Sequence, residues 1–184
     1  MTCARGILGA VMVAFLASGV LAQDAPRPAA IAIGIAQECL RLGDAAFEQS
    51  LTDGLAEADQ AVLVETFEQA TFECLGLSME ICEGQEAGVA CLDDLAAWVR
   101  THRAEIVARL ADVTLSEPTA LARAGAEADT TTCDHMSDAE RERYCEIVSE
   151  GVALEDAYGA WRMARREGAV EMVGHDPIDL ERLQ

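Results

Sequence analysis

Residues 137–166, SDAERERYCEIVSEGVALEDAYGAWRMARR, form the stretch that decides the fold. It opens with Ser137-Asp138-Ala139-Glu140, a capping box in which the Ser137 hydroxyl accepts from the Glu140 backbone N–H and the Glu140 carboxylate reaches back to the cap. Gly151 lies within the pattern that follows, either as a close-packing site or as a break. The stretch therefore predicts an amphipathic helix with an apolar stripe formed by Ile147, Leu154, Tyr158 and Trp161.

Three arginines, Arg162, Arg165 and Arg166, lie near the end of this predicted helix. The C-terminal end of a helix carries a partial negative charge, which nearby cations stabilise. We therefore expect these arginines to act as a favourable helix end rather than as an anion-binding site.

Similar periodicity predicts three helices upstream. The first begins at Pro28, a residue suited to the first helical turn, and runs up to the turn signal Thr52-Asp53-Gly54. The second is expected to end near Leu77, and its stripe is Leu63, Phe67, Ala70 and Cys74. After a loop bracketed by two glycines, the third carries the stripe Leu92, Leu95, Val99, Ile106 and Leu110.

No segment alternates in the manner of a strand, so the prediction is an all-α fold, a small helical bundle of about four helices stapled by disulfides. Residues 23–173 are expected to form a single helical domain. Within it, residues 113–132 hold Pro118, Gly125 and three consecutive threonines and are predicted to be a linker, with room for a short helix after Ser116. Residues 174–184 are predicted to be an irregular tail.

The first 22 residues have the three parts of a secretory signal peptide. Arg5 gives a positive start, residues 7–21 are apolar, and small residues at Val20 and Ala22 predict cleavage before Gln23. The apolar run is shorter than the roughly 20 residues that span a bilayer. We therefore expect a periplasmic or secreted protein with no membrane insertion after cleavage.

Seven cysteines are present, and Cys3 would leave with the signal peptide. The remaining six are Cys39, Cys74, Cys82, Cys91, Cys133 and Cys145. In an oxidising compartment an even number predicts three disulfides, although 15 pairings are possible. Cys82 with Cys91 could close locally across a glycine turn, as could Cys133 with Cys145 across a helix start. Metal binding and thiol redox chemistry are less well supported because no Cys-x-x-Cys occurs.

The chain is strongly acidic, with a net charge of −20. Without residues 1–22 it would lose one arginine and no acid, so 12 arginines would face 33 acids, a net charge of −21. Such a field repels nucleic acid and anionic lipid and favours a cationic partner. The alternative is that the acidity only keeps the protein soluble and monomeric.

The sequence contains no hydrolase, phosphate-binding or EF-hand motif, and its histidines His102, His135 and His175 form no cluster at metal-ligand spacing. We therefore predict no catalytic residue, no metal and no cofactor, and we expect His102 to be solvated. Trp98 and Trp161 are predicted to lie in the core. The acid pairs Asp93-Asp94 and Glu155-Asp156 are expected to be surface charge and are the candidate partner-binding residues.

The segment from Cys74 to Trp98 resembles the exported LprI-type lysozyme inhibitor family. It has a Cys at a helix end, Gly76, a second Cys, a loop ending in Gly88, a third Cys, and Trp98 seven residues later. A second similarity follows Cys145, in Leu154-Glu155-Asp156-Ala157-Tyr158, where the family has Leu-Asn-x-x-Tyr. The match is divergent and partial, covering about half of the mature chain. It implies an exported helical module, with lysozyme inhibition as the activity of some members.

The resulting hypothesis is an exported, acidic, disulfide-stabilised binding protein that is lysozyme-inhibitor-like and non-catalytic, with a cationic protein such as lysozyme as its partner. Two alternatives stay open: a structural or assembly-assisting component of the bacterial cell envelope, and an exported enzyme of unrecognised type.

Overall fold

The computed structural model describes residues 28–53, 57–127 and 133–174. The expected signal peptide, most of the expected tail and part of the expected linker lie outside these ranges. The described residues are arranged in five α-helices with no strand: α1 (Pro28–Thr52), α2 (Glu57–Glu83), α3 (Gly88–Arg109), α4 (Glu117–Glu127) and α5 (Asp138–Arg166). The all-α prediction is confirmed, with one helix more than the four expected.

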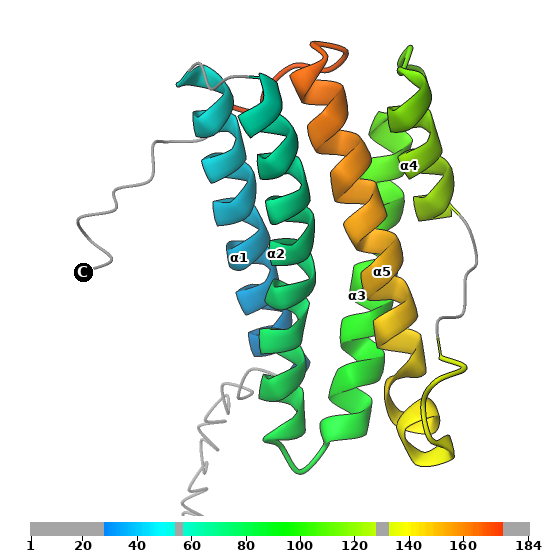
Figure 1. The fold of residues 1–184 in the computed structure, drawn as a ribbon. Coiled ribbons are helices and arrows are strands. Elements are labelled where there is room, and N and C mark those ends of the chain that lie inside the picture. The colour runs from blue at the N-terminus through cyan, green and yellow to red at the C-terminus, as the bar shows by residue number, and fades with distance from the viewer. Residues whose placement is uncertain (1–27, 54–56, 128–132, 175–184) are drawn as a thin grey trace, which may run out of the picture.

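The four long helices form an elongated bundle with α4 on its outer side (Figure 1). α1 and α2 make an antiparallel pair, α5 packs against both α2 and α3, and α4 packs mainly on α5. The core between the helices is aliphatic and includes Leu40, Leu75, Leu92, Leu95 and Leu154. Trp161 is buried and Trp98 packs against the core, as predicted.

α5 has the local structure that its sequence predicts. The Ser137 backbone N–H donates to Glu140 Oε2 at 3.0 Å and the Glu140 N–H donates to Ser137 Oγ at 3.4 Å, so both halves of the capping box are formed. Gly151 is a close-packing site and not a break, because a Cβ there would lie 3.2 Å from Leu75 Cδ1 of α2. α5 can therefore run through the middle of the bundle without interruption.

α2 extends six residues past the predicted end at Leu77. Gly76 lies just before the predicted end, but the residues after it are tied into the core. Ser78 and Cys82 are fully buried, and Cys82 is bonded to Cys91 of α3. Tertiary burial thus outweighs the modest cost of a glycine inside a helix.

The predicted linker at residues 113–132 contains α4, which belongs to the bundle. Thr119 of α4 is fully buried, and its hydroxyl donates to Glu167 Oε1 at 2.7 Å, which fixes the start of α4 to the end of α5. Ser116 donates to the same oxygen at 2.6 Å. Pro118 and Gly125, which suggested a linker, lie within α4 itself, and Pro118 is in its first turn, where proline is tolerated.

Within the residues that the structure describes, none of the helices is both long enough and apolar enough to span a membrane.

Candidate functional site

The structure does not bring the two predicted acid pairs together. Asp93 and Asp94 are exposed on α3, whereas Glu155 and Asp156 are half-buried on α5. Burial raises the pKa of both Glu155 and Asp156, with Asp156 adding to the effect at Glu155. Asp156 faces α4, since a Cβ at Gly125 would lie 2.8 Å from its Oδ2.

The two pairs are also far apart along the bundle. Arg100 of α3 is paired with Glu146 and Glu150 of α5, so these residues lie at the same level. Asp94 comes six residues before Arg100 and Glu155 comes five residues after Glu150. At 1.5 Å per residue, these offsets place Asp94 and Glu155 about 16 Å apart along the bundle, so the two pairs are not adjacent.

All six cysteines in the described residues are paired. The disulfides are Cys39–Cys74 between α1 and α2, Cys82–Cys91 across the α2–α3 turn, and Cys133–Cys145 at the start of α5. The expectation of three bridges is confirmed, and so are the two local pairings that the sequence suggested. Among the described residues no group of His, Cys, Asp and Glu could hold a metal ion.

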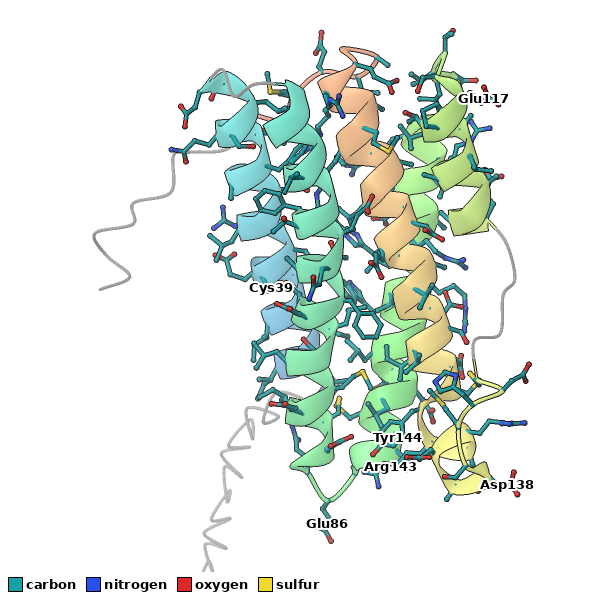
Figure 2. All side chains as sticks on the ribbon, in the orientation of Figure 1. Cys39, Glu86, Glu117, Asp138, Arg143 and Tyr144 are labelled. Atoms are coloured by element: carbon teal, nitrogen blue, oxygen red, sulfur yellow. A yellow bond between two sulfur atoms is a disulfide. The ribbon has the colours of Figure 1, made fainter. Side chains whose placement is uncertain are left out.

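Exposed acids gather where α2 ends and α3 and α5 begin. We call this region the acidic end; its acids are Glu80, Glu83, Glu86, Asp93, Asp94, Asp134, Asp138, Glu140 and Glu142. Glu86 and Asp138 mark it in the lower part of Figure 2. Asp93 and Asp94 thus belong to a larger acidic surface that sequence reasoning did not identify, because helices distant in the chain contribute to it.

A groove of about 450 Å³ lies on the acidic end. Its lining combines two carboxylates, Glu83 and Glu140, with His135 and with the apolar side chains Met79, Met136, Tyr144 and Val148. A hydrogen bond with Glu83 raises the pKa of Tyr144, which links α2 to α5 across the groove. The guanidinium of Arg143 lies 5.3 Å from the centre of the Tyr144 ring, so one face of this ring already contacts a cation.

A second polar feature, a buried charge cluster, lies inside the other half of the bundle. It consists of Asp44 and Glu48 of α1 with Arg162 and Arg165 of α5, all buried. Asp44 pairs through Oδ1 with Arg162 Nε at 3.3 Å and through Oδ2 with Arg165 Nη2 at 3.1 Å. Glu48 Oε1 lies 3.3 Å from Arg165 Nη1. Arg162 and Arg165 therefore pair with buried carboxylates of α1, a role that goes beyond the predicted stabilisation of a helix end.

The two acids and two arginines of the cluster balance in charge, but their removal from water is unfavourable. Arg162 is only 1 % exposed, and this desolvation lowers the pKa of its guanidinium despite the attraction of Asp44. Its Nη1 also donates to the Phe67 carbonyl at 2.6 Å and to Thr71 Oγ1 at 3.0 Å on α2. Burial likewise raises the pKa of the neighbouring Tyr158. The cluster thus ties α1, α2 and α5 together at one point.

His102 lies next to this cluster and is half-buried, whereas the sequence predicts a solvated side chain. Its Nε2 lies 2.9 Å from the Tyr158 hydroxyl, and its ring stacks on Trp98 with centroids 5.2 Å apart. Only 27 % of its side chain is exposed, and burial lowers the pKa of the imidazole. The helical stripe could have indicated this position, because His102 follows Trp98 and Val99 on the face that meets α5.

This arrangement predicts a pH-dependent loss of stability. The unfolded chain binds a proton at His102 near the ordinary pKa of about 6.5, whereas the folded protein resists it. Stability is therefore full above that pH and falls as the pH decreases toward the lower folded pKa. In urea titrations between pH 8 and pH 5, we expect His102→Gln to flatten this decline. The matched control His135→Gln, at the exposed end of the bundle, should keep the original profile; equal profiles for all three proteins would contradict the assignment.

Comparison with known proteins adds no relative: no family model, no curated protein and no solved structure matches this chain.

Proposed function

We propose that this protein is an exported, non-catalytic binding protein whose acidic end docks a cationic partner protein. The observation that carries the proposal is the groove at that end, which combines carboxylates, two methionines and an aromatic ring. The resemblance of the segment around Cys74–Trp98 to LprI-type inhibitors makes a lysozyme the specific partner that we propose. Three disulfides are compatible with an oxidising compartment, which supports a periplasmic or secreted location.

The distribution of arginines supports an acidic docking surface. Most described arginines are used in ion pairs within the bundle, among them Arg41 with Glu38, Arg100 and Arg103 with Glu150, and Arg162 and Arg165 with Asp44. Among the described residues of the acidic end, the arginines are Arg141 and Arg143, which accompany nine exposed acids. A field of one sign on one face attracts and orients a partner of opposite charge.

The groove is also suited to a cationic side chain of the partner. A lysine or arginine inserted there would meet the carboxylates of Glu83 and Glu140, while its aliphatic stem would lie against Met79 and Met136. Charge-assisted hydrogen bonds are the stronger class of hydrogen bond. Long-range attraction and a specific anchor would thus act at the same place.

Surface plasmon resonance on an immobilised cationic lysozyme tests the proposal. We expect binding at about 0.01 M salt, with an association rate that falls at least tenfold as the salt rises to about 0.15 M and the Debye length shrinks from about 30 Å to 8 Å. A cell-wall turnover assay with and without the oxidised protein measures whether the bound lysozyme is inhibited.

Two variants with equal change of charge locate the contact. The first neutralises the acidic end by Glu83→Gln, Glu86→Gln, Asp93→Asn and Asp94→Asn. The second neutralises exposed acids elsewhere by Asp53→Asn, Asp112→Asn, Glu117→Gln and Glu171→Gln; Glu117 is labelled at the opposite end in Figure 2. We expect the first variant to slow association much more than the second. Equal slowing would contradict docking at this end, and no binding at low salt would remove the lysozyme hypothesis and favour a component of the cell envelope.

A further inference from the structure

A groove on the α1–α2 side of the bundle leads to the buried charge cluster. It has a volume of about 480 Å³ and is mainly apolar, with Leu40, Leu42, Ala46, Ala70 and Leu77 among its lining residues. Both cysteines of the Cys39–Cys74 disulfide also line the groove, and Cys39 is labelled in Figure 2. Its volume lies in the range of small-molecule sites, about 300–1,000 Å³.

One end of the groove reaches the guanidinium of Arg162. Nε and Nη1 of Arg162 are engaged by Asp44, Phe67 and Thr71, but Nη2 has no hydrogen-bond acceptor in the part of the chain that the structure describes. Gly43 opens the path to it: a Cβ at this position would lie 3.7 Å from Nη2, with no other contact within 4 Å. Nη2 is therefore open to the groove, and a molecule that displaces water from the groove must accept from it, because a desolvated donor without an acceptor is costly.

We propose that this groove binds a neutral, mainly aliphatic molecule that accepts one hydrogen bond from Arg162 Nη2 through a hydroxyl or carbonyl oxygen. The aliphatic part would lie along the leucines and alanines between α1 and α2. At roughly 30 Å³ for each water-sized group, the groove holds a ligand of up to about 16 heavy atoms.

The charges around the groove favour a neutral ligand over a carboxylate. Asp44 and Glu48 already neutralise Arg162 and Arg165, so the cluster offers a donor without a net positive charge. Glu73 lines the groove as well, and the whole chain carries a net charge of −20. An anionic head group would be repelled, whereas a quaternary ammonium head group has no lone pair with which to accept from Nη2.

Calorimetric titration with three probes of equal chain length tests the chemistry: octanol, octanoate and octyltrimethylammonium. With the oxidised full-length mature protein, we expect octanol to bind at least tenfold more tightly than either charged probe, because it alone can accept from Nη2 without an ionic penalty. Equal affinity for the three probes, or tighter binding of octanoate, would overturn the proposal.

Two variants of the same helix test the location. Gly43→Leu fills the path to Nη2 and should abolish octanol binding, while circular dichroism shows an intact helical fold. Gly34→Leu is the matched control: it lies earlier on α1, is exposed, and has nothing within 4 Å of a Cβ, so octanol binding should persist. The assignment would be overturned if Gly43→Leu still bound octanol. It would also be overturned if a second copy of the protein covered the groove in solution and the groove took up no octanol.

Discussion

Asp44→Asn is expected to lower the free energy of unfolding by about 3–5 kcal/mol, the usual cost of removing one partner from a buried ion pair. Asp44 is 8 % exposed and is the shared partner of Arg162 and Arg165. An amide keeps the shape of the side chain but leaves two guanidinium groups in the interior with only Glu48 to balance them. Urea denaturation of the oxidised protein measures the loss.

The control is Glu38→Gln, which breaks the exposed pair with Arg41 on the same helix. Exposed pairs contribute little, so this variant should be close to the unmodified protein. A similar, small effect at both positions would mean that solvent reaches the cluster and that Asp44 is not buried in solution.

A second variant separates the cost of an unpaired charge from loss of packing. Asp44→Leu combined with Arg162→Met removes both charges of one pair and leaves Arg165 with Glu48. Replacing a buried ion pair by apolar residues of similar volume is often neutral or stabilising. We therefore expect the double variant to be more stable than Asp44→Asn, although Thr71 and the Phe67 carbonyl lose a hydrogen-bond donor.

Features encoded over a few residues could be predicted from the sequence. The capping box at Ser137 and Glu140 satisfies backbone groups within one turn, so its four residues are sufficient to place the start of α5. The pairing of Cys133 with Cys145 is similarly short-range, since both lie around that helix start. The end of α2 was misplaced because it depends on Cys82 being held by α3, which no local pattern expresses.

The buried charge cluster could not be predicted because its members are more than 100 residues apart in the chain. Arg162 and Asp44 meet across 118 residues, and the three arginines near the end of α5 match the pattern of an ordinary helix end. One signal was present: Asp44 follows Leu40 and precedes Phe47 at spacings of four and three, which places a carboxylate on the buried stripe of α1. A charged residue in such a stripe requires a partner of opposite charge, and the arginines in the stripe of α5 provide it.

Removing the Cys39–Cys74 disulfide should destabilise the protein more than removing Cys82–Cys91. The first bridge closes a loop of 35 residues and the second a loop of 9. In the chain-entropy model these loops correspond to about 4 and about 2.5 kcal/mol of restriction on the unfolded chain. We expect urea titrations of the Cys39→Ala/Cys74→Ala and Cys82→Ala/Cys91→Ala variants to show this order, with mass spectrometry confirming that the other two bridges remain closed.

The loss of packed sulfur atoms should favour the opposite order of stability, so the comparison separates loop closure from packing. Cys82 and Cys91 are both buried, at 0 % and 2 % exposure, whereas Cys39 is half-buried, so replacement by alanine removes more buried contact from the shorter loop. If loop closure dominates, the longer bridge has the larger effect despite this difference. The reverse order would mean that the sulfur atoms at the α2–α3 turn stabilise the fold mainly as part of its core. Because this turn forms the base of the acidic end, the same variant should then also weaken binding of the cationic partner.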